Sequence, residues 1–191
     1  MNINKGEAGY IREKKNVLLL ILIIESILVL SVFLIGVFKT RTVPNVFTFI
    51  AAIIAVPTLI TLFKLMRFLP YRSINEAREL EISGKTEFLT TLYDLLIKGN
   101  RKIMPIRAVV ISDNIICAYT NDRSVKSDYA EAFLKNKLSS LGISKITVRV
   151  FHDYVSFLSR AEGMQNMAAI EGYSRSERVD TIVEILKNNS L

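Results

Sequence analysis

Side chains that bind metals or form disulfides are scarce in this 191-residue sequence, which has no tryptophan, one cysteine and one histidine. Cys117 has no second cysteine to pair with, and it lies in an apolar run where a thiol acts as a small buried hydrophobe. Cys117 and His152 together fall short of the four ligands of a structural zinc site. We therefore predict no disulfide and no metal site, and a lone free thiol suits a reducing, cytoplasmic compartment.

Two short motifs that suggest enzyme chemistry are incomplete. Gly84-Lys85-Thr86 looks like the end of a phosphate-binding loop, but Glu79 stands where that loop needs its first glycine. His152-Asp153 is better explained by a helix start, because aspartate is a good N-cap residue. We therefore predict no catalytic residue and no cofactor. The alternative is a membrane-anchored enzyme whose site matches no known motif.

The positive charge of the chain, +7 in total, is concentrated near its N-terminus. Residues 1–69 contain eight basic and three acidic residues, whereas the remainder contains seventeen and fifteen. A nucleic-acid-binding domain needs a clustered basic face, and the nearly neutral second part lacks that signal. The sequence therefore predicts no nucleic-acid partner.

Two long apolar stretches, residues 17–38 and 45–63, contain a single charged side chain between them. A bilayer core needs about 20 apolar residues in a helix. The first stretch is too long for a signal peptide and lacks a small-residue cleavage site. We predict a tail over 1–15 and a transmembrane hairpin over 16–69, with helices at about 16–38 and 45–69, in contact with membrane lipid.

The distribution of basic residues around the two stretches predicts their orientation, because positive charge is retained on the cytoplasmic side. Four basic residues precede the first stretch, three follow the second, and the connecting loop has two. Both termini are therefore expected in the cytoplasm, in an arrangement consistent with a bacterial plasma membrane.

The rest of the chain reads as a stalk helix over 70–83 and a small α+β domain over 84–191. Capping boxes begin helices at Ser73 and Ser174, and Asp113-Asn114 predicts a two-residue turn of a β-hairpin. The expected order in the domain is α-β-β-α-β-α-α, with helices covering one face of the sheet. The expected elements are a helix at 85–98, strands at 106–112 and 115–120, a helix at 125–141, a strand at 145–151, and helices at 153–162 and 175–188.

Glu25 is the most informative polar residue, because it lies near the centre of the first apolar stretch. An ionisable side chain at that depth costs about 2.5–3.5 kcal/mol on insertion scales, so it usually faces other protein. In an antiparallel hairpin, Thr58 and Thr61 lie near the same depth. We therefore predict an intramembrane polar contact among Glu25, Thr58 and Thr61, inside the hairpin or between protomers.

The predicted function is that of a two-pass membrane protein that presents a non-enzymatic interaction or regulatory module to the cytoplasm. Its partner is expected to be another protein or a second copy of the chain. The predicted docking face is the solvent-exposed face of the strand at 145–151, with Lys145, Thr147 and Arg149. The alternative is a self-assembling complex, or a channel or transport accessory subunit, that uses Glu25.

Overall fold

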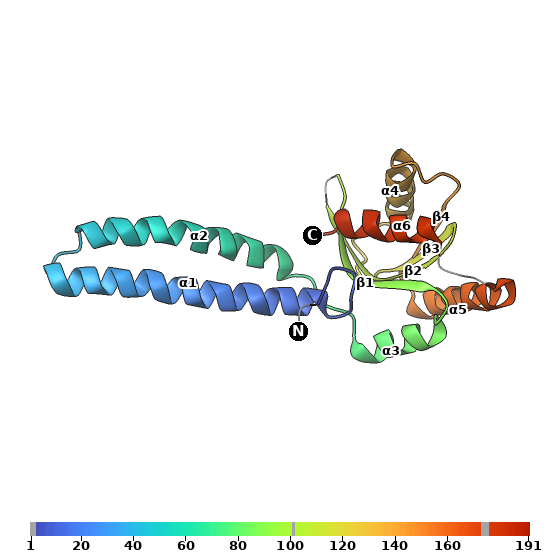
Figure 1. Ribbon diagram of the computed structural model, residues 1–191, viewed down its shortest axis with the longest axis horizontal. Helices are drawn as coiled ribbons and strands as arrows, with labels where there is room; N and C mark the ends of the chain where they lie inside the picture. Colours follow the sequence, from blue (N-terminus) through green and yellow to red (C-terminus); the bar gives the residue numbers. More distant parts are fainter. Residues whose placement is uncertain (1–2, 101, 173–175) are drawn as a thin grey trace. The chain divides into compact units, whose positions relative to one another are not determined.

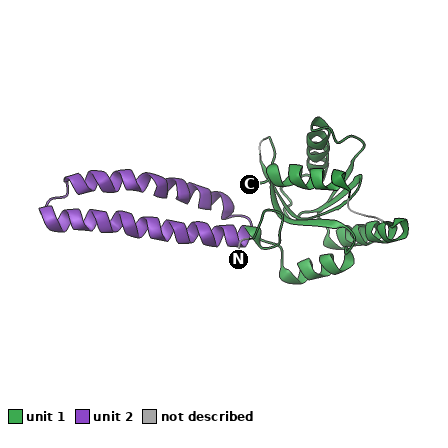
Figure 2. Cartoon of the chain, in the orientation of Figure 1, with its two compact units in different colours: residues 1–10, 73–191 green, residues 11–72 purple. Residues whose placement is uncertain are grey.

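The computed structural model describes residues 3–100, 102–172 and 176–191, and the chain divides into two compact units (Figure 2). One unit combines residues 1–10 with 73–191, and the other comprises residues 11–72. Residues 3–10, expected in a tail, and 73–83, expected in a stalk, therefore belong to the same unit as the sheet. The helical hairpin is an insertion between two parts of one α+β unit.

The hairpin consists of α1 (Tyr10–Thr40) and α2 (Val46–Phe68), both long and apolar enough to cross a membrane. The Asn45 side chain caps α2 by accepting a hydrogen bond from the backbone N–H of Thr48 at 3.0 Å. At the other end of α2, Lys15 of α1 donates to the carbonyl oxygen of Leu69 at 2.9 Å. Gly36 lies where a β-carbon would be 2.5 Å from that of Phe47, so glycine permits the close approach near the turn.

The sheet of the α+β unit has four strands in the order β1-β2-β3-β4. Its strands are β1 (Thr90–Lys98), β2 (Ile103–Ser112), β3 (Ile115–Tyr119) and β4 (Thr147–Phe151). The first three are antiparallel neighbours, and β4 runs parallel to β3 after the crossover helix α4 (Ser127–Ser140). The predicted hairpin turn at Asp113-Asn114 is confirmed, because Ser112 pairs with Ile115.

Helices cover both faces of this sheet, so the prediction of a single covered face is wrong (Figure 1). On one face α4 and α6 (Glu177–Asn188) bury a cluster that includes Leu134 and Ile182. On the other face α3 (Glu76–Lys85) and α5 (Tyr154–Glu171) bury a second cluster that includes Ile82 and Phe157. A sheet covered on both faces needs continuous apolar strands, and β1 is buried at six successive positions.

The helix predicted over 85–98 is wrong, because most of that segment forms β1. Leu92 and Leu95 pack into the same apolar cluster, although a regular strand would place them on opposite faces. The alternation changes phase at Asp94, whose φ is +52°. Such a change places apolar side chains three residues apart, which is the spacing that indicates a helix.

Both ends of α3 differ from the predicted boundaries, because local capping determines where this helix begins and ends. The N-cap of α3 is Asn75 rather than Ser73, and the helix continues through Gly84 to Lys85. Asp153 caps α5 as predicted, accepting from the backbone N–H of Ser156 at 2.8 Å. The capping box predicted from Ser174 lies partly outside the described residues.

The outer edge of β1 is covered by the two terminal segments of the chain. Near the N-terminus, the carbonyl oxygen of Gly6 accepts from the N–H of Tyr93 at 2.8 Å. At the C-terminus, Leu191 donates to the carbonyl oxygen of Leu96 at 3.0 Å, and Ser190 forms a bridge with Ile97. These contacts satisfy backbone groups that an exposed edge strand would offer to other chains.

Replacing Phe157 by alanine is expected to destabilise the α+β unit by about 3–5 kcal/mol, because it empties a large buried volume. Phe157 is fully buried, and its ring lies 5.6 Å from that of Tyr119. The matched control on the same helix is Val155→Ala, whose side chain is 71% exposed and should change stability by less than about 0.5 kcal/mol. Urea unfolding of the full chain in detergent measures both, and equal effects would contradict the packing of α5.

Candidate functional site

A buried carboxylate joins the two places where the chain leaves the α+β unit for the hairpin and returns from it. The side chain of Asp94 accepts from the backbone N–H of Gly9 at 2.9 Å through Oδ2 and from that of Ile74 at 2.8 Å through Oδ1. Gly9 directly precedes α1, and Ile74 follows α2 after a short linker. One side chain of β1 therefore binds both segments that flank the hairpin.

The strand is distorted at Asp94 in a way that directs its side chain to this junction. The β1–β2 register pairs Tyr93 with Ala108 and Leu95 with Ile106, but it leaves Asp94 and Arg107 without a pairing. The same change of phase occurs in β2, where Ile106 and Val109 both face the α4–α6 cluster. Such local irregularities in sheets re-aim side chains. Aspartate tolerates a positive φ better than most residues, which fits its presence at this position.

Burial dominates the electrostatics of this junction. The Asp94 side chain is 1% exposed, and burial raises the pKa of its carboxyl group. Hydrogen bonds from Ile74, Ser73 and Gly9, together with the positive charge of Arg107, oppose the rise in this pKa. A carboxyl group with such partners is compatible with burial, because its oxygens exchange water for backbone donors.

The predicted polar contact of the hairpin lies between α1 and α2. Thr61 donates through Oγ1 to Oε1 of Glu25 at 3.3 Å. Thr58 lies one turn away on α2, but among the described residues neither its hydroxyl nor Oε2 of Glu25 has a hydrogen-bond partner. The structure thus brings Glu25 and Thr61 together and leaves Thr58 outside the contact.

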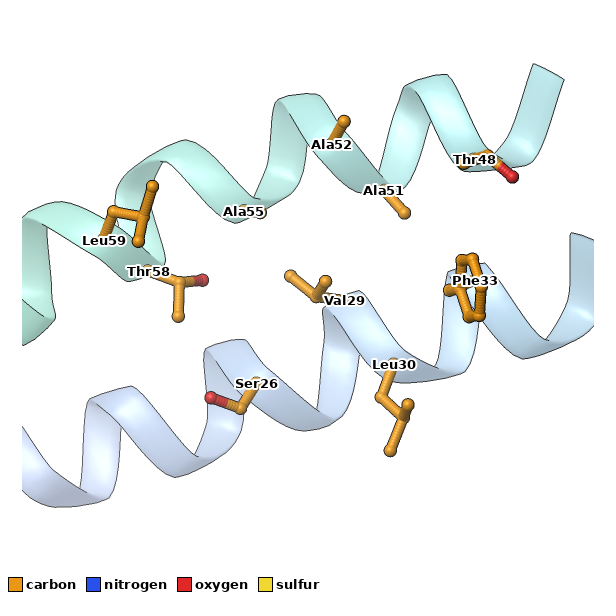
Figure 3. A pocket seen from close by; sticks show the side chains of 10 residues that line it. All are labelled: Ser26, Val29, Leu30, Phe33, Thr48, Ala51, Ala52, Ala55, Thr58 and Leu59. Carbon is orange, nitrogen blue, oxygen red and sulfur yellow. The ribbon is translucent and has the colours of Figure 1, made fainter. Parts of the chain in front are cut away.

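Beside this contact, the two helices separate to leave an open groove of about 620 Å³. Figure 3 shows Val29 and Thr58 extending into the space between the helices. The α2 side of the groove consists largely of small side chains, namely Ala51, Ala52 and Ala55. Small residues allow a further helix to approach closely, so the groove has the form of a helix-packing surface.

On the predicted docking face of β4, the charge of Arg149 is paired with an acid of α4. Arg149 forms an ion pair with Glu131 of α4 at 3.6 Å, and the same carboxylate accepts from the backbone N–H of Val150 at 2.9 Å. Thr147 is exposed at the start of β4, and Lys145 lies just before it with a φ of +57°. Glu131 therefore closes part of this sheet edge with a side chain of the chain itself.

The motifs considered for catalysis are engaged in local structure. Cys117 is fully buried, and burial raises the pKa of its thiol to about 12, which disfavours the reactive thiolate. Thr86 donates through Oγ1 to the carbonyl oxygen of Ile82 at the end of α3, and Lys85 pairs with Glu162 at 2.5 Å. Within residues 3–100, 102–172 and 176–191, no group of acidic, histidine or cysteine side chains could hold a metal ion.

Sequence reasoning missed Asp94, although its signal was present. It is the only charged residue in the run Leu92–Ile97, and an acid in a buried strand requires partners. The incorrect prediction of a helix over 85–98 hid this signal, because a helix has an exposed polar face on which Asp94 needs no buried partner.

Comparisons with protein-family models, curated proteins and solved structures give no match for this chain.

Replacing Asp94 by asparagine is expected to lower the unfolding free energy by about 1–3 kcal/mol, because one of two buried N–H groups then faces an amide donor. Asp94→Ala removes both acceptors and should cost more. The exposed Glu184 of α6 provides the control, since Glu184→Gln should change stability by less than about 0.5 kcal/mol. Chemical unfolding of the full chain measures all three variants, and a neutral Asp94→Ala would contradict the junction.

The same variants test how the contribution of Asp94 to stability changes with pH. Since the pKa of Asp94 is raised from 3.8 on folding, the folded chain holds more protons between the two values. Its contribution to stability is therefore greatest below pH 3.8 and declines as the pH rises through the folded pKa. The unfolding free energy of the wild type should exceed that of Asp94→Asn by an amount that shrinks as the pH rises. A difference that grows with pH instead would show that folding lowers the pKa of Asp94.

In the hairpin, Thr61→Val is expected to destabilise by about 0.6 kcal/mol, the average value of a hydrogen bond between transmembrane helices. Thr58→Val is the matched control, because it removes a hydroxyl that has no partner within the described residues and should be neutral. Unfolding in mixed detergent micelles compares the two, and an equal loss in both would exclude a specific Glu25–Thr61 contact.

Proposed function

We propose that this chain is a two-pass membrane protein whose hairpin anchors an α+β module for protein interactions. The observation that carries the proposal is the exposure of the two long helices. Only 6% of the most apolar stretch of α1 is buried, and 11% of that of α2. A core helix of a soluble protein would bury its apolar side chains, whereas a lipid bilayer is the solvent that such a surface needs.

The chain segments that build the α+β unit support a hairpin with both ends on one side of the membrane. Residues 3–10 and 73–100 contribute to the same folded unit, so the chain has to return to the side that it left. Basic residues flank both ends of the hairpin, which favours the cytoplasm for that side. The module is then cytoplasmic.

The difference between the two edges of the sheet favours an interaction role for the module. The terminal segments cover β1, whereas β4 is the outer strand on the opposite side and is closed only in part by Glu131. The module also has a well-packed core on both faces of its sheet. A rigid scaffold with surface hollows suits recognition of another protein.

Self-assembly through the hairpin is a second candidate, favoured by the groove lined by Ala51, Ala52 and Ala55. A helix from a second copy fits such a small-residue surface. If Glu25 instead serves ion or proton movement, Glu25→Gln should abolish flux in liposomes with the fold intact. Under the structural role proposed for Glu25, that substitution has little effect, because glutamine keeps the oxygen that accepts from Thr61.

Membrane insertion and sidedness can be measured on one set of variants. Cys117→Ala removes the only thiol, and Thr42→Cys or Glu184→Cys then places one in the interhelical turn or in the module. We expect the chain to stay in the membrane fraction in alkaline carbonate. In intact cells, a membrane-impermeant maleimide should label Thr42→Cys and spare Glu184→Cys until the cells are opened.

Three results would contradict parts of the proposal. Release of the chain by carbonate would exclude an integral membrane protein. Labelling of Glu184→Cys alone in intact cells would reverse the orientation. Labelling of both positions from outside would exclude a hairpin that crosses the membrane.

A further inference from the structure

Two adjoining hollows lie on the flank of α4 that faces away from β4. Their volumes are about 480 and 410 Å³, and both are lined by Asn100 and Tyr129. Because they share these residues, they adjoin along α4, and we describe them together as one groove. We call it the lysine–aromatic groove.

The cationic side chains of this groove have no acidic counterpart among its lining residues. Lys102 and Lys126 line one hollow and Lys137 lines the other, and no aspartate or glutamate in the described part of the chain lines either one. Lys102 donates to the carbonyl oxygen of Ser124 at 3.4 Å. The pKa of Asp122, which lies outside both linings, is lowered first by a hydrogen bond from Ser124 and more weakly by Lys102. A groove whose described lining carries lysines and no acid favours a negatively charged occupant.

The other flank of α4 is different, which makes the charge of the groove specific to one side. The hollow between α4 and β4 is lined by Lys135 and Arg149 but also by Asp128 and Glu131. There the cations and carboxylates balance, and Arg149 is paired with Glu131. The same helix thus presents a neutralised flank and a cationic flank.

Apolar surface accompanies the lysines. The rings of Tyr129 and Phe133 stack along α4 with centroids 6.2 Å apart, and Tyr129 is 44% exposed. The buried side chains of Met104 and Val125 form the floor of the first hollow. Exposed aromatic rings beside a pocket are typical anchors of protein interfaces.

We propose that the lysine–aromatic groove binds an acidic segment of a partner protein that carries an apolar side chain. Carboxylates of the segment pair with Lys102, Lys126 and Lys137, and its apolar side chain packs against Tyr129. This inference rests on the proposed interaction function and specifies its surface and the chemistry of its partner.

A protein segment fits these observations better than a nucleic acid. The chain after residue 69 has seventeen basic and fifteen acidic residues, whereas a nucleic-acid-binding domain is typically strongly basic. Isolated lysines next to a ring suit a few carboxylates and one apolar anchor.

The test selects ligands without assuming a sequence. Full-length protein in detergent micelles is panned against a random peptide library, and recovered peptides are synthesised and titrated by fluorescence anisotropy. We expect them to be net acidic with an aromatic or aliphatic residue. Their Kd should rise at least about tenfold in Lys126→Glu/Lys137→Glu and also in Tyr129→Ala, and it should rise with salt.

One control double variant and one competitor keep the test specific. Lys135→Glu/Arg160→Glu makes the same charge change at exposed positions outside the groove and should leave the Kd unchanged. Failure to recover acidic peptides, or equal loss of binding in both double variants, would overturn the groove assignment. So would a thymidine oligonucleotide that competes with the peptides at lower concentration and is itself lost in Lys126→Glu/Lys137→Glu, which would assign the groove to nucleic acid.

Carbonate extraction of the same variants separates the two proposals. If peptide binding fails while the chain stays in the membrane fraction, the groove assignment is wrong and the membrane function stands. If carbonate releases the chain while peptides bind as expected, the membrane function is wrong and the groove assignment stands.

Discussion

The structure depends on a single buried carboxylate that binds backbone groups from both sides of an inserted hairpin. Asp94 accepts from Gly9, just before α1, and from Ile74, in the segment after α2. A buried charge or acid is costly unless hydrogen bonds replace its water, and these two N–H groups also need acceptors. Each partner therefore satisfies the other, and the α+β unit closes around the point where the hairpin departs.

This junction shows how the α+β unit accommodates a long insertion. Both segments that flank the hairpin are bound to β1 within that unit. The terminal segments also occupy the outer edge of β1. The hollows around α4 differ in charge, because acids and cations line one flank together and lysines line the other.

Much of the architecture could be predicted from the sequence because it depends on strong local signals. The apolar stretches, the Asp113-Asn114 turn and the Asp153 cap each have a local cause, and depth arithmetic indicated Glu25 and Thr61 as neighbours. The helix assigned to 85–98 failed because the distortion at Asp94 imitates helical spacing. The junction and the lysine–aromatic groove escaped prediction because both join residues distant in sequence, and tertiary proximity leaves no local pattern.

Hydrogen exchange of individual backbone amides tests the junction most directly. In the wild type, the amide protons of Gly9 and Ile74 should be protected far beyond those of a loop and should exchange in the same cooperative opening. In Asp94→Ala, both should lose that protection while the amides of β2 and β3 keep theirs. Rapid exchange of either amide in the wild type, or undiminished protection of both in Asp94→Ala, would show that Asp94 does not hold these two segments to β1.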